Sequence, residues 1–89
     1  AQYWAFQAAT LSLTSEVAIT YFSLRALDSR IDLYRKRVVE YRTAYQLSSD
    51  RYERGLIEYI DVMDRLQTLS TAEANLAELE QERGLYENL

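Results

Sequence analysis

The sequence has no cysteine, no proline and no histidine, and it has only two glycines among 89 residues. Without cysteine the chain can form neither disulfide bonds nor thiolate metal sites, and without histidine it lacks the commonest general base and metal ligand. It also lacks a glycine-rich phosphate loop and a convergent set of acids and bases. We therefore expect no enzymatic activity and no cofactor.

Proline is the residue that most often breaks a helix, and its absence leaves long helices uninterrupted. Apolar and aromatic residues follow a heptad repeat through the first part of the chain, which is typical of a coiled-coil helix. We predict this helix over about residues 8–54. One row of the repeat holds Val17, Leu24, Ile31, Val38, Tyr45 and Tyr52. The other row holds Phe6, Leu13, Thr20, Leu27, Tyr34, Tyr41 and Ser48.

A second helix is predicted over about residues 58–89, where apolar residues recur at spacings of three and four. Its stripe consists of Val62, Leu66, Leu69, Ala72, Leu76, Leu79 and Tyr86. Gly55 can end the first helix, because glycine adopts the left-handed conformation at little cost. Two helices joined by a tip as short as residues 55–57 must lie side by side. The fold class is therefore all-α, with residues 1–89 forming one long antiparallel α-helical hairpin, a coiled coil.

The two arms carry charge of opposite sign. Residues 1–54 hold eight basic and six acidic side chains, whereas residues 55–89 hold two and eight. This balance suits an antiparallel hairpin and argues against a nucleic-acid partner, which needs an unpaired basic face. Folding about residue 56 predicts that the basic run 35–37 lies near Glu73 and Glu78, and Arg30 near Glu80 and Glu82. We favour such pairing over a phosphate-binding patch.

Aromatic residues admit two interpretations in two places. Tyrosines on the heptad rows could stack a ligand or pack between helices, and we favour packing: Tyr34, Tyr41, Tyr45 and Tyr52. The cluster of Tyr3, Trp4 and Phe6 could be a core contact or an interfacial belt, and we favour the contact. Because residues 1–20 have no partner within the hairpin, we expect the chain to self-associate or to belong to a longer one. No apolar run approaches the ~18–20 residues of a membrane-spanning helix.

The tip is apolar. Ile60 is expected to close the end of the hairpin, and Leu56 and Ile57 to be partly exposed, which the residues alone leave open as a contact site or as simple closure. Asp61 is expected in the first turn of the second helix, where the helix dipole favours a carboxylate by roughly 0.3–1 kcal/mol. Asp61 and Asp64 could bind a divalent cation, but such pairs are common on solvated helices and we expect no metal site.

The order Arg51, Tyr52, Gly55, Leu56, Asp61 and Val62 resembles a motif of the outer-membrane efflux protein family, the TolC-like channels. There, R-[YF]-x-x-G-L ends a periplasmic helix, and D-V opens the return helix. Residues 11–28 are similar to the start of that helix in the lipoprotein branch of the family, and residues 66–76 fit its return helix. Glu58 departs from the pattern, because many relatives carry a serine or threonine cap there.

The resemblance implies that the chain is part of a larger α-barrel, the periplasmic tunnel of a trimeric bacterial outer-membrane channel for exported small molecules. It assigns Gly55, Leu56 and Ile57 to contact with a periplasmic adaptor, which leads to an inner-membrane pump, and Asp61 to the start of the return helix. Two alternatives stay open: the hairpin of the adaptor itself, and a generic coiled-coil scaffold. Adaptor tips follow an Arg…Leu…Ser pattern, so Gly-Leu followed by Asp-Val favours the channel.

Overall fold

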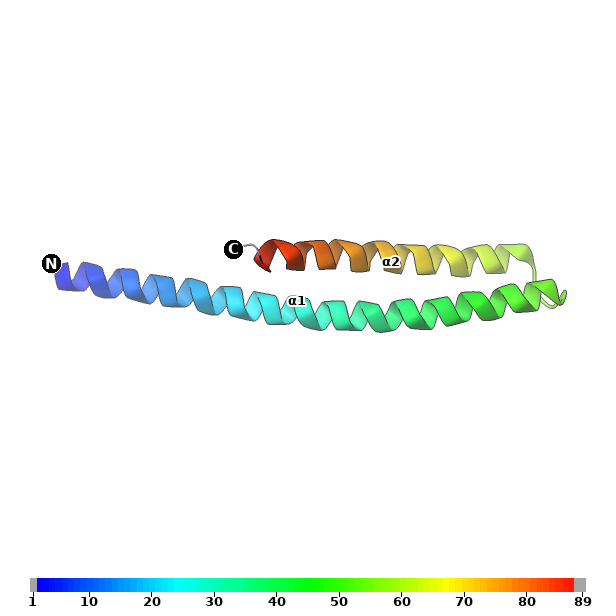
Figure 1. Ribbon diagram of the computed structural model, residues 1–89, viewed down its shortest axis with the longest axis horizontal. Helices are drawn as coiled ribbons and strands as arrows, with labels where there is room; N and C mark the ends of the chain where they lie inside the picture. The colour runs from blue at the N-terminus through cyan, green and yellow to red at the C-terminus, as the bar shows by residue number, and fades with distance from the viewer. Residues whose placement is uncertain (1, 88–89) are drawn as a thin grey trace.

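The computed structural model describes residues 2–87, which form two long helices, α1 (Gln2–Glu53) and α2 (Tyr59–Glu87). The helices run antiparallel and are joined by residues 54–58 (Figure 1). The molecule is a rod that measures 80 × 16 × 16 Å. Its length is that of α1 alone, because 52 helical residues with a rise of ~1.5 Å each span nearly this distance. The predicted all-α hairpin is therefore confirmed.

The start of α1 differs from the prediction, whereas the helix ends next to the tip agree with it. α1 begins at Gln2 and not near residue 8, because the first residues contain neither glycine nor proline and include the helix formers Ala5, Ala8 and Ala9. It ends at Glu53, and α2 begins at Tyr59, each within one residue of the predicted bound. The predicted end of the second helix at residue 89 lies outside the described residues.

The predicted heptad rows form the contact between the helices. Two clusters of buried side chains lie along it, each built from both helices: Leu27, Ile31 and Leu79 in one, and Val38, Leu69 and Ala72 in the other. Tyr34, Tyr41 and Tyr45 are half-buried and pack against these clusters, which confirms packing as the role of these three tyrosines. We call this line of contacts the seam.

The seam is a single narrow row. Its best-buried side chain, Val62, is still 3% exposed, and no described side chain is less than 2% exposed. Each helix consequently buries one stripe and leaves most of its circumference open. The stability of the hairpin depends on this row, because the part of the chain that the structure describes has no second layer of helices or strands to shield it.

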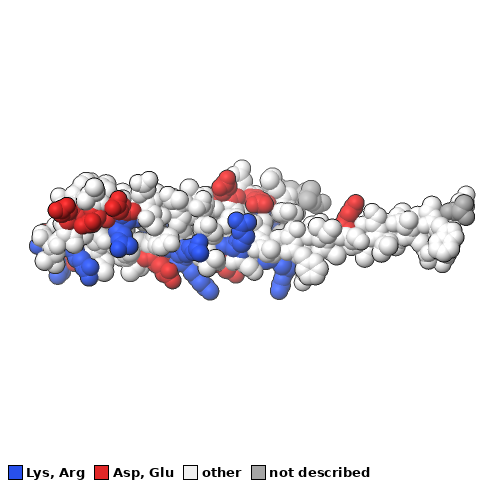
Figure 2. Space-filling view, turned by 180° about the vertical axis from the view of Figure 1, so that it is seen from behind, with Lys and Arg blue, Asp and Glu red and all other residues white. Residues whose placement is uncertain are grey.

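α1 extends beyond the end of α2. Every side chain from residue 2 to residue 23 is exposed, although the heptad rows continue there with Phe6, Leu13 and Val17. We call residues 2–23 the extension. Figure 2 shows charged side chains gathered where both helices run, and an extension almost free of them. The extension therefore presents an apolar face that nothing within residues 2–87 covers.

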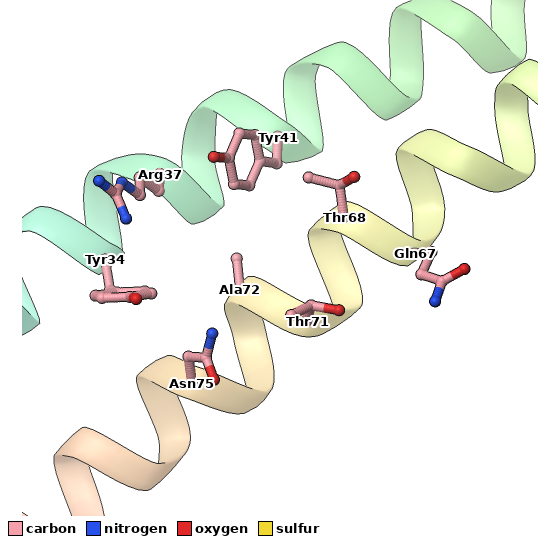
Figure 3. A pocket seen from close by; sticks show the side chains of 8 residues that line it. All are labelled: Tyr34, Arg37, Tyr41, Gln67, Thr68, Thr71, Ala72 and Asn75. Atoms are coloured by element: carbon pink, nitrogen blue, oxygen red, sulfur yellow. The ribbon is translucent and has the colours of Figure 1, made fainter.

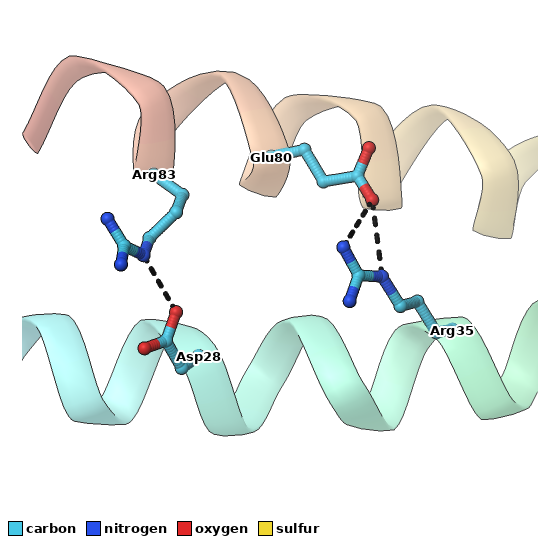
Figure 4. A network of polar contacts seen from close by, with 4 residues as sticks. All are labelled: Asp28, Arg35, Glu80 and Arg83. Atoms are coloured by element: carbon cyan, nitrogen blue, oxygen red, sulfur yellow. Dashed lines mark hydrogen bonds and ion pairs between the residues drawn. The ribbon is translucent and has the colours of Figure 1, made fainter. Parts of the chain in front are cut away.

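Among the described residues, three ion pairs join the helices. Arg83 Nε donates a hydrogen bond of 2.8 Å to Asp28, and the guanidiniums of Arg35 and Arg42 each lie 3.2 Å from a carboxylate oxygen, of Glu80 and Glu73 respectively. Figure 4 shows the pairs of Asp28 and Arg35 side by side. All three pairs connect a basic side chain of one arm with an acidic side chain of the other. The prediction that ion pairs join the two arms is therefore confirmed.

The individual residues predicted to pair with each other were wrong. Arg35 pairs with Glu80, which was assigned to Arg30, and Glu73 pairs with Arg42, which lies nearer to the tip than the basic run 35–37. The reason is the register of the helices. A fold about residue 56 would place residue 77 opposite Arg35, but the link continues through Glu58, and α2 is shifted by three residues.

Arg83 occupies a seam position that the sequence prediction passed over, seven residues after Leu76. Its side chain is 27% exposed, and it reaches both Asp28 and Glu87, which lies 3.3 Å away. Arginine at such a position keeps its aliphatic stem on the seam while its guanidinium reaches the edge.

We predict that Leu69→Ala lowers the free energy of unfolding by about 2–3 kcal/mol, because the cavity cannot be refilled from a second layer. Helical circular dichroism against urea concentration measures the effect. Leu69 is 7% exposed. Leu11, at 68%, gives the matched control, and Leu11→Ala should change the free energy by less than about 0.5 kcal/mol. Equal changes in the free energy of unfolding for the two variants would contradict the claim that the seam stabilises the hairpin.

We also predict that the ion pairs differ in strength. A double-mutant cycle on Asp28 and Arg83 should give a coupling free energy of about 1 kcal/mol, since Arg83 is partly buried and the contact is short. The same cycle on Arg35 and Glu80 should give less than about 0.5 kcal/mol, because both side chains are exposed. A larger coupling free energy for Arg35 and Glu80 than for Asp28 and Arg83 would contradict this prediction.

Candidate functional site at the hairpin tip

Gly55 terminates α1 in a Schellman motif. It is left-handed, with φ of 75°, and its N–H donates a hydrogen bond of 2.9 Å to the carbonyl of Tyr52. The N–H of Leu56 donates to the carbonyl of Arg51, also at 2.9 Å. These two bonds satisfy carbonyls that the end of a helix leaves without partners. The tip is therefore a closed turn with a defined backbone.

The return helix starts immediately afterwards. The N–H of Asp61 donates a hydrogen bond of 3.1 Å to the backbone carbonyl of Glu58, and Asp61 lies in the first turn of α2. Its carboxylate is thus near the positive end of the helix dipole. Glu58 takes the position before the helix, where a serine or threonine would usually accept a bond from the first turn.

The apolar residues of the tip divide into inward and outward ones. Val62 is only 3% exposed and closes the end of the seam, whereas Ile60 is 63% exposed. The expectation that Ile60 closes the hairpin was therefore wrong. The heptad explains why, since Val62 lies seven residues before Leu69 on the buried face and Ile60 is turned away from it. Leu56 is 69% exposed, and Ile57 is half-buried.

Two tyrosines join the ends of the helices. The rings of Tyr52 and Tyr59 lie 5.3 Å apart between centroids, at an interplanar angle of 59°. Tyr52 was predicted to pack in the seam, but it is 44% exposed, and its neighbour Tyr59 is 55% exposed. The prediction missed this pair because α1 ends one residue after Tyr52, so the seam does not continue past it. Aromatic pairs at such centroid distances contribute about 0.5–1.5 kcal/mol.

A shallow groove lies beside Ile57. Its lining carries both signs of charge, with Arg51 and Arg65 next to Asp61 and Asp64. A second groove lies midway along the hairpin between Tyr34, Tyr41 and polar side chains of α2 (Figure 3). There the guanidinium of Arg37 lies 5.2 Å from the centre of the Tyr34 ring. Both grooves are lined largely by polar and charged side chains.

The described residues 2–87 contain no group of three or more acidic, histidine or cysteine side chains placed to hold a metal ion. Neither of their helices combines the length and the apolar character that crossing a bilayer requires.

A rod with a narrow seam, an uncovered apolar extension and a solvent-exposed apolar tip defines an antiparallel coiled-coil hairpin. The comparison with protein families agrees with this class. The chain belongs to the outer membrane efflux protein family, whose model matches residues 1–87. The family consists of transport channels, so the chain is not an enzyme. Comparisons with curated proteins and with solved structures gave no match.

We predict that Gly55→Ala lowers the free energy of unfolding by about 1–2 kcal/mol, because an L-residue in the left-handed region costs this much. Backbone conformation is the whole cause, since a Cβ at this position meets no atom within 4 Å. Gly84, inside α2, also has open space around it. Gly84→Ala should therefore raise the free energy of unfolding by up to about 1 kcal/mol. Urea titrations of both variants measure the free energies of unfolding. A lower free energy of unfolding for both variants would contradict this prediction.

Proposed function

We propose that this chain is a segment of the periplasmic α-helical tunnel of a trimeric, TolC-like outer-membrane efflux channel of the lipoprotein branch. The observation that carries the proposal is the family match over nearly the whole length of a two-helix rod. A rod of 80 Å with one buried stripe per helix needs neighbours, and a ring of such hairpins supplies them. Exported small molecules pass through the tube by conduction, which needs no catalytic residue and no cofactor.

The tip is the second part of the proposal. Gly55, Leu56 and Ile57 dock a periplasmic adaptor, which connects the channel to an inner-membrane pump. In support, the Schellman motif fixes the backbone of the tip and leaves Leu56 69% exposed, although it is a large apolar residue. A preorganised apolar projection loses little conformational entropy on binding. Ile57 supports the turn from the groove side, and Asp61 holds the start of the return helix.

The two alternatives make different predictions. An adaptor hairpin would meet a channel at its tip, and a generic scaffold would not depend on the chemistry of its tip at all. The family match is to channels and therefore favours a channel segment over an adaptor hairpin. The tip chemistry separates the channel from the scaffold.

The test is a single cysteine in the complete channel in cells, introduced as Leu56→Cys in a background without other reactive cysteines. A bifunctional cross-linker should capture a periplasmic adaptor at this position. Leu85→Cys is the matched control, because Leu85 is 65% exposed but lies ~40 Å from the tip along α2. It should capture no adaptor. Adaptor capture at both positions, or at neither, would contradict docking through the tip.

A loss-of-function variant complements the capture. Leu56→Asp should lower export of a pump substrate at least severalfold, because a charge on the docking surface must be desolvated without a partner. The hairpin itself should stay folded by circular dichroism, since Leu56 is exposed. Unchanged export by Leu56→Asp would favour the scaffold.

A further inference from the structure

The described helices contain two half-buried arginines, and only one of them has carboxylate partners. Arg83 Nε lies 2.8 Å from a carboxylate oxygen of Asp28, and its Nη1 lies 3.3 Å from one of Glu87. Arg37 takes part in none of the ion pairs within residues 2–87, and its guanidinium lies 5.2 Å from the centre of the Tyr34 ring. An aromatic face attracts a cation, but it gives the N–H donors at the edge of the guanidinium no acceptor. A partly desolvated cation in this state favours an anion beside it.

The heptad repeat explains why Arg37 has no carboxylate beside it in the described hairpin. One flank of the seam carries the cross-arm pairs of Arg35 and Arg42. On the other flank, three arginines of α1 recur at multiples of seven residues: Arg30, Arg37 and Arg51. Each lines a groove together with a residue from a matching row of α2: Glu82, Asn75 and Asp61, respectively. The central arginine therefore has a neutral carboxamide where the outer two have a carboxylate.

The groove around Arg37 is hollow because α2 carries the small Ala72 there, where the neighbouring seam positions carry leucine. Its volume is about 300 Å³, which suits a small organic molecule. Tyr34 and Tyr41 line it from α1 (Figure 3). The α2 side presents hydroxyls and amides, which both donate and accept hydrogen bonds: Gln67, Thr68, Thr71 and Asn75. None of the described residues that line this groove is acidic, so Arg37 makes it a positively charged, partly aromatic site.

We propose that this groove binds a small aromatic carboxylate. The carboxylate accepts hydrogen bonds from the guanidinium of Arg37, whose planar fork matches its two oxygens. The aromatic ring of the ligand packs against Tyr41, and the amide of Asn75 donates to the carboxylate from the other helix. A neutral sugar would leave the charge of Arg37 uncompensated, and an inorganic anion would leave the tyrosine rings without a partner. All these contacts lie within one hairpin, so the proposal goes beyond the tunnel function and stands without it.

Salicylate is a suitable probe, because it is a fluorescent aromatic carboxylate that is anionic at neutral pH. The purified full-length protein, without adaptor or pump, should bind salicylate about tenfold more tightly than salicylamide, which keeps the ring but has no carboxylate. Inorganic phosphate keeps a negative charge but lacks the ring, and it should compete about tenfold more weakly than unlabelled salicylate. An affinity for salicylamide or phosphate equal to that for salicylate, or no binding of salicylate, would overturn the proposal.

Substitutions on the two sides of the groove locate the site. Asn75→Asp gives Arg37 the carboxylate that the outer two arginines have beside them. It should lower the affinity for salicylate by about tenfold, because the new carboxylate pairs with Arg37 and repels the ligand. Arg37→Gln should lower the affinity to a similar extent. Arg30→Gln is the matched control, because Arg30 lies on the same flank beside Glu82, and it should change the affinity by less than about twofold.

Circular dichroism should show the three variants to be as helical as the unchanged protein, because none of the substituted residues belongs to the buried clusters of the seam. An equal loss of affinity for Arg37→Gln and Arg30→Gln, or no loss for Asn75→Asp, would overturn the proposal. Capture of an adaptor at Leu56 does not involve this groove, so the two proposals fail separately.

Discussion

The structure depends on one narrow seam between two helices. Seven apolar side chains are buried in the whole described molecule, and they lie in a single line: Leu27, Ile31, Val38, Val62, Leu69, Ala72 and Leu79. Burial of this kind contributes roughly 1.5–3 kcal/mol for each large side chain, against the conformational entropy of every ordered residue. A hairpin held by such a row is a building element, and its remaining surface is free for neighbours.

The tip depends on the seam as well. Val62 closes the last layer between the helices, directly after the turn at Gly55. The Schellman hydrogen bonds then make the turn rigid without help from a larger core. In the proposed function, this small apolar projection at the end of the rod is the surface that docks the adaptor. The family match gives this geometry its biological setting in outer-membrane efflux.

The heptad rows and Gly55 predicted the hairpin, because both are local signals: a period of seven and a residue tolerant of positive φ. The register could not be predicted, since it depends on how many residues the link uses, and a shift of three residues reassigned the partners of Arg35 and Glu73. Val62 was predicted in the buried stripe and lies there, whereas Ile60 was expected to close the hairpin and is exposed. Ile60 lies two residues before Val62 and is therefore turned away from the buried face of α2. The contact between the rings of Tyr52 and Tyr59 could not be predicted from the sequence, since the two residues belong to different helices and meet across the link.

Hydrogen exchange of backbone amides, followed by mass spectrometry on the intact chain, tests the dependence on the seam most directly. We predict the slowest exchange in residues 27–45 and 62–79, where both helices contribute buried side chains. Exchange in the extension, residues 2–23, should be faster by orders of magnitude at low protein concentration, because an isolated helix is only marginally stable. Protection in the extension equal to that in residues 27–45, or no protection anywhere, would contradict the account.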